Sequence, residues 1–184
     1  MNAICSRLNE ILPNSLRKEG GLKLESQVIP VNFRDFFMQD GFNVLPGFRK
    51  RILCFAPQGY VYKTNYAQLV YFDAVYKERL ISNLDIIQFL PSKSEFNLIE
   101  GLEAVVNLLF LTQNTQKDYL LLKDGKINFF RLSVSNVVSD VTLYFDTENE
   151  QWCVDANEPG QTGQWEGSLR IFACDRPQLS MMIA

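Results

Sequence analysis

Hydrophobic and polar residues alternate most regularly in the final third of the chain, where the alternation predicts antiparallel strands. Apolar residues occupy every second position in 141–146 and again in 151–156. A four-residue loop at 147–150 closes the two segments into a hairpin. Its register pairs apolar with apolar residues at every inward position: Phe145 with Trp152, Leu143 with Val154, and Val141 with Ala156.

Further strands extend this hairpin into a predicted five-strand antiparallel meander over residues 118–174. Asp124-Gly125 favours a two-residue turn and predicts a second hairpin, in which Leu122 lies opposite Ile127 and Asp118 opposite Arg131. Residues 165–174 alternate as a last strand, with Phe172 breaking the pattern. The meander is therefore the expected centre of the fold.

The main predicted helix covers residues 97–113 and has a wide apolar stripe. Asn97 and Glu100 have the spacing of an N-terminal cap, and Gly101 either weakens the helix slightly or allows another backbone to approach closely. So broad an apolar surface is typical of a helix packed centrally on a sheet.

Shorter patterns predict the remaining elements. They are a helix at 3–12, a turn at 17–21, an edge strand at 22–31, short strands at 52–56 and 60–63, a helix at 65–80 and a buried strand at 84–90. For residues 33–45 two alternatives stay open: a short helix ending at Gly41, or a hairpin around Asp40-Gly41.

These elements define an α+β fold class. A curved, mainly antiparallel sheet with a C-terminal meander packs against two or three helices, and a small incomplete β-barrel with flanking helices is the alternative. The chain length of 184 residues suits one domain, 1–184, with a loosely held tail at 175–184.

Composition and charge restrict the partners. The hydrophobic fraction of 47% is that of a globular protein, and a net charge of −3 predicts no nucleic-acid partner and no membrane partner. The first residues lack the features of a signal peptide, and the longest apolar run, 105–111, is too short to span a bilayer. The four cysteines are not closely spaced, so we expect reduced thiols in a cytoplasmic protein.

The sequence contains no histidine, which excludes Ser-His and Cys-His nucleophiles and every histidine-ligated metal site. The cysteines lack the paired spacing of a zinc site, and no phosphate loop or dinucleotide fingerprint is present. We therefore expect no metal and no cofactor. An enzyme would have to use carboxylates, Lys, Tyr, Arg or a lone Cys.

Two groups of residues are candidate sites. The first is a tyrosine-rich middle region with a nearby basic run, suited to contact with a partner: Tyr60, Tyr62, Tyr66, Tyr71, Arg49 and Arg51. Its alternative is a set of core-edge tyrosines beside a solvated strand entrance. The second is the polar face of the meander, which supports acid–base chemistry if burial raises a carboxylate pKa and is otherwise a water-exposed sheet face: Tyr144, Asp146, Cys153, Asp155, Glu166 and Arg170.

Three functions follow in order of preference. The first is a non-enzymatic cytoplasmic module that binds another protein, such as an inhibitor, an immunity protein or a chaperone-like adaptor. The second is a protein with an apolar, aromatic-lined pocket for a small molecule between helix 97–113 and the sheet. The third is an enzyme that depends on Asp146, Asp155 or Glu166.

Overall fold

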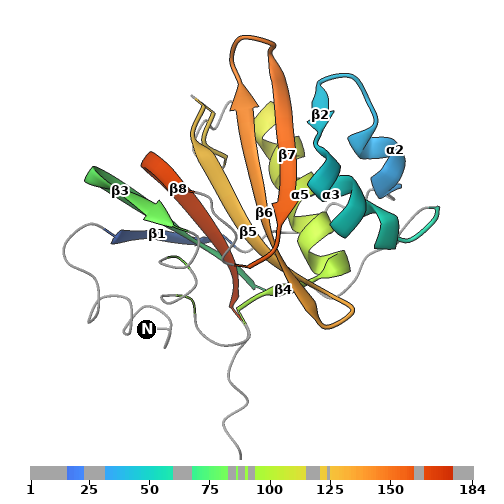
Figure 1. The fold of residues 1–184 in the computed structure, drawn as a ribbon, viewed down its shortest axis with the longest axis horizontal. Coiled ribbons are helices and arrows are strands. Elements are labelled where there is room, and N and C mark those ends of the chain that lie inside the picture. The colour runs from blue at the N-terminus through green and yellow to red at the C-terminus, as the bar shows by residue number, and fades with distance from the viewer. Residues whose placement is uncertain are drawn as a thin grey trace, which may run out of the picture.

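A mixed, mostly antiparallel β-sheet with helices on one face organises the protein (Figure 1), so the predicted α+β class is confirmed. The computed structural model describes residues 16–22, 32–59, 68–82, 86, 90, 94–114, 121–123, 125–159 and 164–175. Seven strands run in the order β1-β3-β8-β5-β6-β7-β2 without closing into a barrel, and an eighth, β4, pairs with β5.

The strands and helices are as follows. The strands are β1 (Leu16–Leu22), β2 (Phe42–Val44), β3 (Gln68–Ser82), β4 (Phe96–Asn97), β5 (Ile127–Val134), β6 (Val137–Asp146), β7 (Gln151–Asn157) and β8 (Gln164–Asp175). The helices are α2 (Phe33–Phe37), α3 (Pro46–Arg51), the 3₁₀ turn η1 (Leu53–Phe55) and α5 (Leu98–Asn114).

The β6–β7 hairpin has the predicted register. Phe145 pairs with Trp152 and Asp146 with Gln151, on either side of the loop at 147–150. The Phe145 and Trp152 rings meet edge to face, with centroids 5.3 Å apart. Such a pair adds about 0.5–1.5 kcal/mol beyond the area it buries. The prediction succeeded because both strands are adjacent in sequence and each specifies the other's register.

The predicted hairpin around Asp124-Gly125 is wrong over its described residues. The turn itself forms, since Lys126 N–H donates to Lys123 O at 3.0 Å, but residues 121–123 belong to no strand. β5 pairs with β6 along one edge and with β8 and β4 along the other, so neither edge is open to a further strand. The tight hairpin lies after β5 instead, where Ser135 and Asn136 both have positive φ.

β8 also departs from the predicted meander. It forms the expected strand, but it pairs in parallel with β5, while β2 pairs in parallel with the outer edge of β7. β8 is therefore internal and buried on both faces, which explains the irregular position of Phe172. The Phe172 ring stacks on Phe130 at 4.6 Å, and Ile171 packs on the opposite face.

The helix predicted over 65–80 is wrong for its described residues, 68–80, because Gln68–Ser82 is the strand β3. Its apolar residues recur at helical spacing, yet β3 pairs with β1 on one edge and β8 on the other. Strand pairing along both edges satisfies the backbone groups of β3. This tertiary context outweighs the weak helical periodicity of its sequence. The predicted turn at 17–21 is likewise part of β1, whose register shifts between Lys18 and Gly20 as in a β-bulge.

Of the two alternatives for residues 33–45, the structure contains the helix, α2. Gly41 follows it with a φ of +93°, and β2 then pairs with β7 and forms no local hairpin. Residues 52–56 are not a strand, since they contain η1, and Leu90 N–H donates to Ile86 O at helical spacing inside the predicted strand 84–90. The predicted elements at 3–12 and 60–63, most of 22–31 and the tail beyond Asp175 lie outside the described residues.

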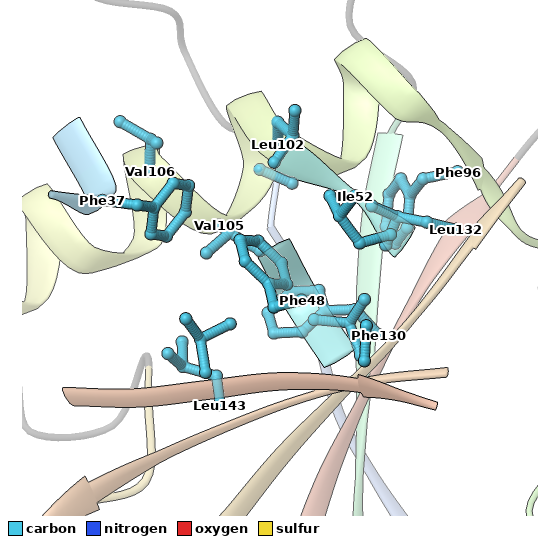
Figure 2. Close-up of a cluster of buried hydrophobic side chains, with 14 of the residues drawn as sticks. Phe37, Phe48, Ile52, Phe96, Leu102, Val105, Val106, Phe130, Leu132 and Leu143 are labelled. Atoms are coloured by element: carbon cyan, nitrogen blue, oxygen red, sulfur yellow. The ribbon is translucent and has the colours of Figure 1, made fainter. Parts of the chain in front are cut away.

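The hydrophobic core lies between α5 and the face of the sheet formed by β5, β6 and β7 (Figure 2). α5 begins with the predicted cap: Glu100 N–H donates to Asn97 Oδ1 at 2.9 Å, and Asn97 N–H donates to Glu100 Oε2 at 3.1 Å. Side chains from α5, the sheet and the segment 32–59 meet there, among them Val105, Leu102, Phe130, Leu143, Phe37 and Phe48.

Gly101 faces β5 at close range. A Cβ on Gly101 would lie 2.5 Å from Leu132 Cγ, and Leu132 is fully buried. We expect Gly101→Ala to lower the free energy of unfolding by about 1–3 kcal/mol, despite the higher helix propensity of Ala. Chemical denaturation of a double-mutant cycle checks the cause. In a Leu132→Ala background the same change should cost much less, and equal costs in both backgrounds would contradict this packing.

Candidate binding surface

Residues 32–59 form an edge module that closes one side of the sheet with α2, β2, α3 and η1 (Figure 1). β2 pairs with β7, and two hydrogen bonds extend this attachment: Trp152 N–H to Gly41 O at 2.8 Å and Leu45 N–H to Val154 O at 3.0 Å. The module is thus part of the sheet through its backbone. Its inner side chains, Phe33, Phe37, Phe48 and Ile52, are completely buried in the core.

α3 starts where the module turns back along β7. Pro46 occupies the start of the helix, where its missing N–H costs nothing, and Gly47 follows. A Cβ on Gly47 would lie 2.3 Å from Ala156 O and 2.4 Å from Asp155 Oδ1. Glycine at this position lets α3 pack directly on the β7 backbone. This contact sets the direction of α3 and of the chain that follows it.

Arg34 connects α2 to the chain after α3. Its Nη2 donates to Cys54 O at 3.1 Å and lies 3.5 Å from Ala56 O. The exposed Cys54 thiol in turn donates to Lys50 O at 2.7 Å. These contacts hold α2, the last turn of α3 and η1 together as one outer surface.

Two large apolar side chains of this outer surface face the solvent. Met38 is 61% exposed and Phe55 is 55% exposed. Met38 lies one helical turn after Arg34, while Phe55 lies between the two residues whose carbonyls Arg34 contacts. Periodicity does not identify either residue, since each lies at the end of a short helical element whose preceding apolar residue, Phe37 or Leu53, is buried.

The basic run belongs to the same outer surface. Arg49 and Lys50 are exposed in the last turn of α3, so the run is helical and not the predicted strand entrance. Arg49 Nε donates to Val44 O at 3.0 Å, and Arg51 forms an ion pair with Glu158. Arg49 and Arg51 therefore help to hold α3 in place.

Tyr71, the described member of the predicted tyrosine-rich group, lies away from the edge module. Tyr71 is on β3, half-buried, with its ring 4.5 Å from the guanidinium carbon of Arg170 and 6.0 Å from the Phe172 ring. Four strand spacings separate β3 from β7, about 19 Å at the usual strand separation. Tyr71 is therefore not brought together with Arg49 and Arg51. Tyr60, Tyr62 and Tyr66 lie outside the described residues.

The polar sheet face retains four of its six predicted residues. Tyr144 lies opposite Cys153, and Asp146 and Asp155 occupy positions on the same face of the hairpin. Arg170 is not on that face, because its register partner Asn128 pairs with the inward-facing Leu143, and Arg170 is itself buried. Glu166 is on β8, separated from β7 by β5 and β6, and its side chain lies outside the described residues.

The carboxylates of this face have structural partners. Asp146 accepts hydrogen bonds from the Asn149 side chain at 2.8 Å and from the backbone N–H groups of Asn149 and Glu148. These bonds, with those of Asn149 the strongest, hold the pKa of Asp146 below its ordinary value. Asp155 Oδ1 accepts from Ala156 N–H at 2.8 Å. The Asp146 carboxylate thus stabilises the hairpin turn and is a poor proton donor.

Tyr144 is the most perturbed titratable group of this face. Burial, then a hydrogen bond with the buried Cys153 and the charges of Asp146 and Asp155, raises the pKa of Tyr144 to about 12. A raised pKa keeps the hydroxyl protonated at neutral pH, where it can donate a hydrogen bond.

This pKa predicts a specific alkaline dependence. The unfolded chain ionises Tyr144 near pH 10, so stability from the neutral phenol is complete below pH 10 and is lost as the pH rises through 12. Absorbance titration should assign a phenolate step near pH 12 to Tyr144, seen as the difference between the wild type and Tyr144→Phe. Denaturant melts at pH 9, 10.5 and 11.5 should show wild type losing stability faster than Tyr144→Phe. A difference spectrum centred near pH 10 would contradict the structure.

No cluster of three or more Cys, Asp or Glu able to hold a metal ion occurs among the described residues. Within that part of the chain, no helix is both long and apolar enough to cross a bilayer. Comparisons with protein-family models, curated proteins and solved structures found no match.

Proposed function

We propose that this protein is a non-enzymatic, cytoplasmic module that binds another protein, with the outer surface of residues 32–59 as its docking surface. The observation that carries the proposal is the exposure of Met38 and Phe55, two large apolar side chains held on adjacent segments by Arg34. Exposed aromatic anchors with neighbouring Arg side chains are typical of interface hot spots.

Two features support a binding role over an enzymatic one. The carboxylate oxygens of Asp146 are engaged by its turn, and Cys153 is buried against Tyr144 without a histidine to activate it. The three described cysteines, Cys54, Cys153 and Cys174, have free thiols, which suits a reducing compartment.

The small-molecule pocket remains the second hypothesis. Its predicted place is the space between α5 and the sheet, where side chains of α5, β5, β6 and the edge module pack together (Figure 2). A ligand there would have to displace buried aromatic residues such as Phe48 and Phe130. The docking surface needs no such rearrangement, and we therefore prefer it.

A site-specific photo-cross-linking experiment tests the proposal. A benzophenone amino acid replaces Phe55 in one variant and Met38 in another, and both are expressed in the organism that encodes the chain. We expect the same discrete adduct from both positions, resolved on a denaturing gel and identified by mass spectrometry. With the purified partner, Phe55→Ser should raise Kd about tenfold or more, as hot-spot truncations do.

Val137 is the matched control. It is 56% exposed, close to the value for Phe55, and lies in the β5–β6 hairpin outside the edge module. The benzophenone at position 137 should give no adduct of that size, and Val137→Ser should leave Kd unchanged. Equal labelling from positions 55 and 137, or no adduct from either edge-module position, would refute the proposal.

A further inference from the structure

The edge module carries charge of the opposite sign to the chain as a whole. Its residues 32–59 contain four basic and two acidic side chains, whereas the whole chain has 18 basic and 21 acidic residues. Three of the four basic residues are consecutive in the last turn of α3. A positive surface on a net negative protein favours a partner of negative charge at that place.

Phe55 follows the basic run closely in the chain. Phe55 N–H donates to Ile52 O, one residue after Arg51, and the Cys54 thiol donates to Lys50 O. Arg34 Nη2 contacts the carbonyls of Cys54 and Ala56, the residues on either side of Phe55. A surface complementary to an apolar side chain with basic residues around it has an apolar residue surrounded by negative charge.

In the described part of the chain neither acidic side chain of the module is ion-paired with one of its basic residues, and of the four basic residues only Arg51 has an acidic partner, Glu158. Asp35 is bound to the Asn32 side chain at the start of α2. Asp40 precedes β2, whose first residue pairs with Trp152, whereas Arg51 pairs with Glu158 beyond the other end of β7. These two ends of β7 are about 20 Å apart at the usual rise of a strand, beyond the range of effective surface charge interactions in physiological salt.

From this charge distribution we infer that the partner presents an acidic peptide segment with an aromatic or large aliphatic residue, which packs on Phe55 while its carboxylates lie near Lys50, Arg49 and Arg34. The inference rests on the proposed function and specifies the chemistry of its partner. Nucleic acid is the less suitable occupant, since DNA-binding proteins commonly neutralise 6–10 phosphates, on the order of twice the charge found here.

The test uses the full chain and a phage-displayed library of random dodecapeptides as the probe. We expect the enriched peptides to be rich in Asp and Glu and to contain Phe, Trp or Leu. For a synthetic peptide with an enriched sequence, fluorescence anisotropy gives the Kd of its complex with the full chain. At 50 mM salt this Kd should rise about fivefold with Lys50→Glu and about tenfold with Phe55→Ser. Raising the salt to 300 mM should weaken wild-type binding and reduce the Lys50→Glu effect.

The outcomes separate this inference from the proposed function. Enrichment of neutral apolar peptides that respond to Phe55→Ser but not to Lys50→Glu overturns the acidic partner and leaves the docking surface in place. Peptides that respond to neither change overturn both proposals. Binding of a single-stranded oligonucleotide that is lost with Lys50→Glu overturns the inference in favour of nucleic acid. Val137→Ser and the thermal melt of each variant control for folding.

Discussion

Replacing Gly47 with alanine should lower the free energy of unfolding by about 2–3 kcal/mol, the upper part of the range for an overpacked site. The added Cβ would lie 2.3 Å from Ala156 O, a backbone atom of β7, which cannot move without disturbing its strand pairing. Alanine gains up to about 1 kcal/mol of helix propensity over glycine, which is less than this overlap costs. Chemical denaturation of the variant measures the net effect.

Two companion variants identify the cause of that loss. Lys50→Ala alters an exposed position in the same helix and should change stability by less than about 0.5 kcal/mol. Asp155→Ala removes the second close atom, Asp155 Oδ1, but leaves the carbonyl of Ala156 in place. It should therefore not rescue Gly47→Ala. A stable Gly47→Ala variant, or full rescue by Asp155→Ala, would show that α3 does not rest on the β7 backbone.

Asn128→Leu should cost about 2–3 kcal/mol, because it leaves buried backbone groups without partners. Asn128 is fully buried, and its amide accepts from Leu122 N–H at 2.9 Å and donates to Leu122 O at 2.9 Å and Leu143 O at 3.1 Å. The Asn128 side chain thus supplies the backbone hydrogen bonds that a paired strand would otherwise give Leu122. Denaturant unfolding gives the loss, and hydrogen exchange should show the Leu122 amide losing its protection.

The matched control is Asn43→Leu, the same change at an exposed strand position, which should alter stability by less than about 0.5 kcal/mol. Asn128→Asp supplies a second check. It keeps an acceptor for Leu122 N–H but places a carboxylate against two carbonyl oxygens, so its pKa should rise in the folded state. Stability relative to wild type should therefore improve as the pH falls. Unchanged Leu122 exchange in Asn128→Leu would refute the role given to this amide.

The elements predicted correctly depend on residues close together in the chain. The β6–β7 hairpin needs only a four-residue loop to bring Phe145 to Trp152, and the cap of α5 needs only Asn97 and Glu100. Lys126 N–H donates to Lys123 O and Gly125 has a positive φ, as the predicted turn requires. What failed there was the assumption that strands meeting at a favourable turn must pair, although β8 and β4 occupy that edge of β5.

The candidate site also consists of residues that nearby sequence predicts and residues that it does not. Arg49 and Arg51 were identified from the density of basic residues, and Tyr144, Asp146, Cys153 and Asp155 were placed on one face by the hairpin register. Met38 and Phe55 were missed because apolar residues are expected inside, and only their positions on the edge module expose them. Arg170 does not lie on that face of the hairpin, because β8 pairs with β5 and β3 and does not lie beside β7 in the sheet.

By itself the sequence determined the α+β class, the register of one hairpin, the cap of the longest helix and the exclusion of histidine chemistry. These properties follow from side-chain chemistry acting over a few residues. The tertiary structure decided that 68–82 is a strand, that β8 is internal, and that residues 32–59 close the edge of β7. Such choices depend on which distant backbone groups satisfy one another's hydrogen bonds, and local periodicity carries no information about that partner.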